Sequence, residues 1–176
     1  MDDVRWLGGV GVRPPLNPTE YEYLTAFAES RRWRRPGGPY AVPDHPLLEC
    51  TSPGLDLVAY STVADGQPGL VCPWTPARAG TVLVAGPWPT GGGGADFAAA
   101  VAWLTYLAAH FLGPGARVVG RPGFEQFTGG HVLDGTLAAQ CSTTGRLRLV
   151  TVSDSQVEVR GAYAGVPDTA VHRCAS

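Results

Sequence analysis

The sequence predicts an α+β domain in which an antiparallel sheet packs against one long buried helix, with an N-terminal helix and long irregular loops. Three observations predict this fold: a capped helix start at residues 17–18, an apolar helical run at 96–112, and period-two segments between 132 and 160. The 176 residues fit one domain, 1–176. The 24 glycines and 16 prolines indicate many turns.

The first helix is predicted to begin near Pro18. Asn17 supplies a side-chain oxygen for free N–H groups, and proline suits the first turn. Thr19 and Glu22 have the spacing of a capping box. The expected apolar stripe consists of Leu24, Phe27 and Ala28.

A run of arginines with one tryptophan closes this segment. Cations near a helix C-terminus complement its dipole, which is the simplest explanation of the run. The alternative is an anion site, in which the tryptophan stacks on a base or sugar as aromatic residues do in single-strand binders. The residues concerned are Arg31, Arg32, Trp33, Arg34 and Arg35.

The middle of the chain predicts loops and short strands. Residues 36–55 are rich in proline, glycine and polar residues, so we expect a long irregular connection. Short β-like runs follow, and they predict two or three edge strands. These runs are Leu55 to Val63, Gly69 to Trp74 and Thr81 to Ala85.

The segment 96–112 is the clearest helix in the sequence. It carries no charged side chain from Phe97 to Ala109, so it must be buried on more than one side, by the domain itself or by a second subunit. A homodimer through the 96–112 helix is therefore expected. The glycines at 91–94 before it do not form a phosphate loop, because Asp96 would repel a phosphate there and the lysine of that motif is missing.

After residue 113 the pattern changes to period two and predicts an antiparallel meander. Leu147 and Leu149 alternate with Arg146 and Arg148, so we expect the leucine face to meet the central helix and the other face to be partly wet. Residues 1–13 and 161–176 are expected as irregular tails, the latter with an added edge strand as the alternative. The predicted strands are Ala116 to Val119, Val132 to Gln140, Arg146 to Val152 and Gln156 to Arg160.

The composition bears on the source organism, the cellular location and the partners of the protein. All 13 basic residues are arginine and isoleucine is missing, as expected for a bacterial genome of high GC content. The net charge of −2 gives no reason to expect nucleic acid. An acidic N-terminus without an apolar core predicts a cytoplasmic protein. The charge-free run is shorter than the roughly 20 residues that span a bilayer, so no membrane insertion is expected.

Four cysteines, Cys50, Cys72, Cys141 and Cys174, form no C-x-x-C pair and have no histidine at ligand spacing. We therefore expect no metal and no cofactor. Cys72 could act as a nucleophile with a histidine base, but no signature surrounds it, and packing is the favoured interpretation.

Two sets of residues are candidates for a site. His131 and Asp134 lie close in sequence, and a histidine near a carboxylate can move protons near neutral pH. The alternative is that Asp134-Gly135 is an ordinary turn. Aromatic residues could line an apolar pocket with an arginine as its polar group, although core packing is the alternative. The predicted ligand-binding residues are Trp74, Trp88, Trp103 and Arg148.

The order of several segments resembles a family of small uncharacterised proteins of actinobacteria with phage relatives. The resemblance covers roughly residues 13–40 and 66–160, and its segments include GQPGLVCPW, FAAAVAWLTYLAAHFL and GHVLDGTLAAQ. It implies no activity. The chain departs from the pattern at Val71, where a tryptophan is usual, and at 138–140, as expected if the scaffold were recruited to a cofactor-free step of secondary metabolism.

Three functions remain open at this point. The first is a small cytoplasmic ligand-binding or scaffold domain that needs neither metal nor nucleotide. The second is a cofactor-independent enzyme, of cyclase or isomerase type, in bacterial specialised metabolism. The third is single-stranded nucleic-acid binding through the arginine–tryptophan run.

Overall fold

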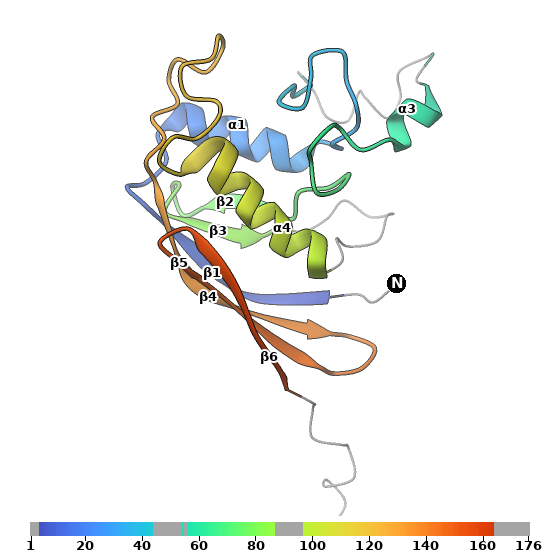
Figure 1. The fold of residues 1–176 in the computed structure, drawn as a ribbon, viewed down its shortest axis with the longest axis vertical. Helices are drawn as coiled ribbons and strands as arrows, with labels where there is room; N and C mark the ends of the chain where they lie inside the picture. Colours follow the sequence, from blue (N-terminus) through green and yellow to red (C-terminus); the bar gives the residue numbers. More distant parts are fainter. Residues whose placement is uncertain (1–3, 44–53, 55, 87–96, 164–176) are drawn as a thin grey trace, which may run out of the picture.

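The computed structural model describes residues 4–43, 54, 56–86 and 97–163. Its centre is a six-stranded antiparallel sheet with the strand order β2-β3-β1-β4-β5-β6. The helices α1 and α4 lie side by side on one face of this sheet (Figure 1). The fold class is therefore α+β with an antiparallel sheet, as predicted.

The strand β1 (Val4–Arg13) contradicts the expectation of an irregular N-terminal tail. It lies inside the sheet, paired with β3 on one side and along its whole length with β4 on the other. Two close approaches explain a glycine of β1 and one of its partner strand β4 (Val132–Cys141): a Cβ on Gly9 would lie 2.7 Å from the Val82 side chain, and one on Gly135 would lie 2.6 Å from the carbonyl oxygen of Gly9. Glycine is needed at both positions.

The helix α1 (Pro18–Glu29) begins where predicted, but its capping box uses different residues. The Asn17 side chain accepts from the backbone of Glu20, and the Glu20 side chain accepts from the backbone of Asn17. Ser30 is the C-cap, so the arginine run lies beyond the helix and not in its last turn.

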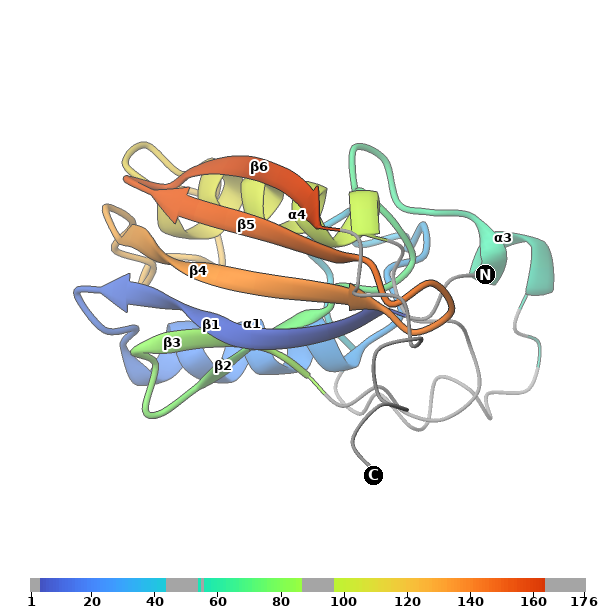
Figure 2. The same cartoon turned by 90° about the horizontal axis from the view of Figure 1, so that it is seen from below.

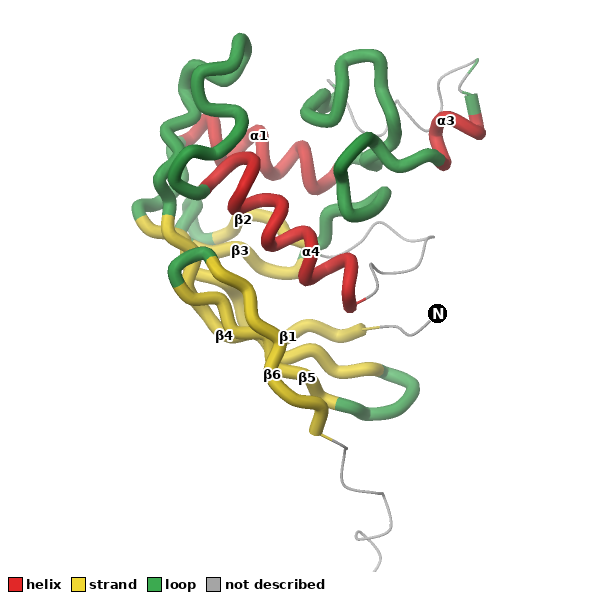
Figure 3. Tube along the Cα trace, viewed as in Figure 1, coloured by secondary structure: helices red, strands yellow, loops and turns green. Residues whose placement is uncertain are grey.

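The middle of the chain is less β-like than predicted. The segment α3 (Leu57–Ser61) is a short helix capped by Asp56, not a strand. The predicted run Gly69 to Trp74 is a strand only at Trp74, where the edge strand β2 (Trp74–Ala77) begins. The run at 81–85 is confirmed as β3 (Val82–Ala85), but it pairs on both sides and is not an edge. Figure 3 shows α3 at a distance from the sheet, next to loops.

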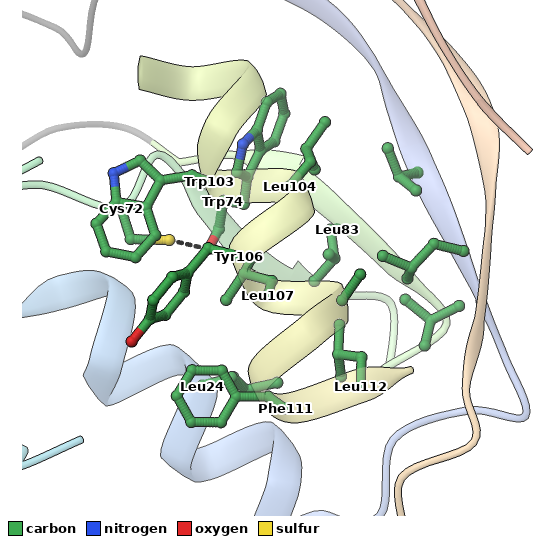
Figure 4. Close-up of a cluster of buried hydrophobic side chains, with 14 of the residues drawn as sticks. Leu24, Cys72, Trp74, Leu83, Trp103, Leu104, Tyr106, Leu107, Phe111 and Leu112 are labelled. Atoms are coloured by element: carbon green, nitrogen blue, oxygen red, sulfur yellow. Dashed lines mark hydrogen bonds between the residues drawn. The ribbon is translucent and has the colours of Figure 1, made fainter. Parts of the chain in front are cut away.

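The helix α4 (Phe97–Leu107) continues into a π-helical turn, η1 (Ala108–Leu112). Its buried side chains face the sheet and α1, and Figure 4 shows several of them among residues of other elements. The exposed line consists of small residues, so the domain itself covers the apolar helix. These exposed residues are Ala98, Ala102, Thr105 and Ala109.

The meander is confirmed as β4 (Val132–Cys141), β5 (Leu147–Ser153) and β6 (Gln156–Tyr163). The part of the predicted tail at 161–163 thus belongs to an edge strand. The predicted strand at 116–119 is wrong, because these residues lie in the turns of the connection from η1 to β4.

The orientation predicted for β5 is also wrong. Val150 and Val152 are buried under the helices, so alternation places Arg148 on the helix side and Leu147 and Leu149 on the opposite face. The guanidinium of Arg148 lies over the ring of Phe97 in α4, which agrees with this orientation. Figure 2 looks onto the opposite face, with the strands in front and the helices behind.

Candidate functional site

A hydrogen-bonded tyrosine and histidine lie at the C-terminal end of the helix formed by α4 and η1. The hydroxyl of Tyr40 and Nδ1 of His110 are 2.6 Å apart, although the two residues are 70 positions apart in sequence. The ring of Tyr106 stacks on that of His110, with 3.8 Å between centroids. His110 is half-buried, and its Nε2 has no hydrogen-bond partner among the described residues.

The π-helical turn places His110. Gly113 closes the wide turn, because its N–H donates to the carbonyl of Ala108, five residues earlier, at 2.7 Å. The carbonyls of Ala109 and His110 accept from the N–H groups of Arg117 and Val118. The turn thereby anchors the following loop against itself. The turn ends the helix at Gly113, and π-turns are a common way for a helix to end.

Two arginines of that loop flank the pair. The guanidinium of Arg121 lies 5.3 Å from the ring centre of Tyr40, and the charge of Arg117 acts on both His110 and Tyr106. Both arginine side chains are exposed, and within the described ranges neither forms an ion pair. Two cations therefore act on the His110 ring, and neither is paired with a carboxylate among the described residues.

The surroundings keep His110 uncharged. Burial, followed by the charges of Arg117 and Arg121, lowers the pKa of His110 to about 4. A neutral ring carries one proton, so when Tyr40 donates to Nδ1, the proton of the ring is on Nε2. Nε2 is then a hydrogen-bond donor without a partner among the described residues.

This geometry gives a testable titration. We expect the ring resonances of His110 in NMR spectra to titrate near pH 4, and the substitution Arg117→Gln to raise that pKa because it removes a repelling charge. The unfolded chain binds this proton at higher pH than the folded one, so His110 makes folding less favourable as pH falls from 6.5 to about 4. A wild-type midpoint near 6.5, unchanged by Arg117→Gln, would contradict this.

The segment that carries Tyr40 is held by buried donors. Arg32 donates to the carbonyls of Pro39 and Ala41 at 2.8 and 3.0 Å, and Gln67 also donates to that of Pro39. The hydroxyl of Tyr23 donates to the carbonyl of Tyr40 at 2.6 Å. The carbonyls of three consecutive residues, 39 to 41, thus accept hydrogen bonds from these side chains. These bonds hold the backbone that carries the Tyr40 ring.

The arginine run predicted as an anion site is occupied by contacts within the chain. Arg32 is 0% exposed, with its guanidinium 3.8 Å from the centre of the Phe27 ring, so no external anion can reach it. Arg31 donates to the carbonyl of Tyr60, Arg35 donates to that of Arg31, and Arg34 pairs with Asp65. The guanidinium of Arg35 also lies over the ring of Trp33.

The structure does not bring His131 and Asp134 together. His131 is 1% exposed and lies between the carbonyl of Pro14, 2.7 Å from Nδ1, and the Glu20 carboxylate, 3.2 Å from Nε2. Asp134 points to the opposite face of the sheet and pairs with Arg13. Both nitrogens of His131 are engaged inside the protein, so this ring is placed to connect α1 to the start of β4.

The predicted pocket residues fall into two groups. Trp74 and Trp103 are 1% and 0% exposed and belong to the core (Figure 4). The indole N–H of Trp74 donates to the carbonyl of Ala100. Arg148 is exposed at the end of a row that runs through Phe97 and Trp6 to Trp74. Trp88 lies outside the described residues.

The described residues do not support a cysteine nucleophile, a metal site or a membrane-spanning helix. Burial raises the pKa of the Cys72 thiol to about 12, which favours packing over nucleophilic attack. No group of three histidine, cysteine, aspartate or glutamate residues there could hold a metal ion. None of the described helices combines the length and apolar character needed to cross a membrane.

Comparison of the chain with protein-family models, with curated proteins and with solved structures found no match in any of the three.

Sequence reasoning missed Tyr40 and did not place His110 in a site of its own. One signal was present: His110 is the only histidine in an otherwise apolar helical run, and Arg117 and Arg121 follow it at intervals of seven and four residues. The contact with Tyr40 had no such signal, because the tertiary fold creates it.

Proposed function

We propose that the chain is a small ligand-binding domain whose ligand is an anion that binds at Tyr40, His110, Arg117 and Arg121. The observation that carries the proposal is the hydrogen-bonded pair of Tyr40 and His110 with the exposed guanidinium of Arg121 5.3 Å from the Tyr40 ring centre, together with exposed Arg117, whose charge also acts on His110. Neither arginine has an ion-pair partner among the described residues. Guanidinium groups bind carboxylates and phosphates through charge-assisted hydrogen bonds. The rings of Tyr40 and Phe124, 5.9 Å apart, add partly exposed aromatic surface for an organic substituent.

The pair of Tyr40 and His110 also favours a second function, a cofactor-independent enzyme. A neutral imidazole bonded to a phenol can pass a proton between the two groups. In this version His110, and not His131, moves the proton. Turnover of a bound ligand that disappears in His110→Gln while binding persists would distinguish the enzyme from the binding domain.

Isothermal titration calorimetry of the full chain with inorganic phosphate and with phenyl phosphate tests the binding proposal. We expect Arg117→Gln and Arg121→Gln each to weaken binding by about tenfold or more, since each removes a charged donor. The matched control is Arg146→Gln, which removes an exposed arginine at the start of β5 and should leave affinity unchanged. Equal losses in all three variants, or no binding by the wild type, would reject the proposal.

A further inference from the structure

The face of the sheet opposite the helices carries several apolar side chains among polar ones. Leu7 of β1, Ala138 of β4 and Leu149 of β5 lie side by side across three strands, and Leu7 is 50% exposed. An antiparallel sheet that is open to water on one side normally carries polar residues there. No described element covers this outer face, which is turned to the viewer in Figure 2. Three further members of the face are Val82, Val84 and Leu147.

The centre of the outer face lacks large side chains. Gly9, Thr136 and Thr151 are register partners on neighbouring strands, so small side chains or none stand in the middle. Gly11 pairs with Val82 in the next row. A sheet without large protruding side chains at its centre can meet another sheet at the roughly 10 Å spacing of packed sheets.

The charges on the outer face are largely balanced within the chain. Arg13 pairs with Asp134 near one end of β4, and Glu158 pairs with Arg160 on the edge strand β6. Arg5 lies at one corner. The face therefore calls for no partner of opposite charge and presents no like-charge repulsion at its centre to an identical surface.

The size of the face suits a weak homodimer. Six strands about 4.8 Å apart span roughly 24 Å, and seven residues of β5 at about 3.3 Å each span roughly 23 Å. The face thus offers roughly 550 Å² or more per chain, at the lower end of specific interfaces, which bury about 800 Å² per partner. We propose that a second copy of this chain packs on this face through a two-fold axis near Thr136.

This dimer replaces the one expected through the 96–112 helix. The exposed line of α4 consists of three alanines and Thr105, which offers little apolar area, whereas the sheet face presents leucine and valine side chains. The two interfaces can be separated by one matched pair of substitutions, because a threonine is exposed at the middle of each surface: Thr136 on the sheet and Thr105 on the helix.

Sedimentation velocity of the full chain from about 1 to 200 µM tests the proposal. We expect the mass to rise with concentration from the 18.4 kDa of one chain toward twice that value. Thr136→Arg places guanidinium groups from both copies near the axis and should weaken association by at least about tenfold. Thr105→Arg should leave association unchanged. Far-ultraviolet circular dichroism checks that both variants fold, and Thr151→Arg replaces Thr136→Arg if the latter unfolds.

Two results would overturn the proposal. One is a wild-type chain that stays monomeric over the whole concentration range. The other is a dimer that Thr105→Arg dissociates and that the folded sheet variant leaves intact, since that pattern would place the interface on α4.

Discussion

Replacing Glu20 with glutamine should lower the free energy of unfolding by about 3 kcal/mol, because buried donors that bond to the carboxylate lose their acceptor. Glu20 and His131 are each 1% exposed and 3.2 Å apart. The carboxylate also accepts from the backbone N–H and hydroxyl of Thr128 and from the backbone N–H of Asn17. Glutamine has nearly the same shape as glutamate, but an NH2 group, which donates, replaces one of the two accepting oxygens.

The same group sets a pH dependence. Burial alone raises the pKa of Glu20, but the hydrogen bonds from Thr128, Asn17 and His131 outweigh it, so the pKa lies below its ordinary value of 4.5. Because the pKa of Glu20 is depressed, the ionised carboxylate stabilises the folded state above pH 4.5. This stabilisation is lost as the pH falls through the folded-state pKa. The acid-induced loss of stability should therefore be smaller in Glu20→Gln.

Urea denaturation at neutral and acid pH measures both effects. The matched control is Glu22→Gln, which changes an exposed carboxylate two residues away on the same helix and should leave stability nearly unchanged. If Glu20→Gln were as stable as Glu22→Gln at neutral pH, the buried pair would not connect α1 to β4 as described.

Replacing Arg32 with methionine should lower the free energy of unfolding by about 2 to 3 kcal/mol, because the carbonyl of Ala41 loses its main donor and the hydroxyl of Ser30 loses its bond with Nη1. Burial, followed by the nearby charge of Arg35, lowers the pKa of Arg32 to about 10, so the group is still charged at neutral pH. Methionine fills much of the same apolar space beside Phe27.

The Arg32 variant also tests how the Tyr40 segment is held. With its anchor removed, we expect phenyl phosphate to bind more weakly to the folded variant than to the wild type. Arg34→Met is the control, because Arg34 is exposed and pairs only with exposed Asp65 among the described residues. It should change neither stability nor binding by much. Full stability in Arg32→Met would contradict the role assigned to this arginine.

Much of the fold follows from local patterns. The cap at Asn17, the apolar run of α4 and the turns between β4, β5 and β6 all act over a few residues, so the sequence alone predicts these elements. The strand β1 could not be found in this way. Its glycines leave room for atoms of β3 and β4, which are distant in sequence. Glycine also has a low β-propensity, so the sequence of β1 does not indicate a strand.

The face of β5 was assigned wrongly for a related reason. Leucines occupy one phase of the alternation and Val150 and Val152 the other, so the apolar pattern permits both orientations. Packing under the helices selects the valine phase and leaves the leucines outside. The candidate site likewise depends on tertiary contacts, since residues 40 and 110 are distant in sequence and Arg32, Gln67 and Tyr23 hold the segment of Tyr40 in place.

NMR of the full chain during titration with phenyl phosphate tests the central claim most directly, that His110, Tyr40, Arg117 and Arg121 form one anion site. We predict saturable shifts of the His110 ring resonances and a pKa for His110 that rises from about 4 in the complex, because a bound anion favours the imidazolium. Saturable binding that leaves the resonances and pKa of His110 unchanged would contradict the account.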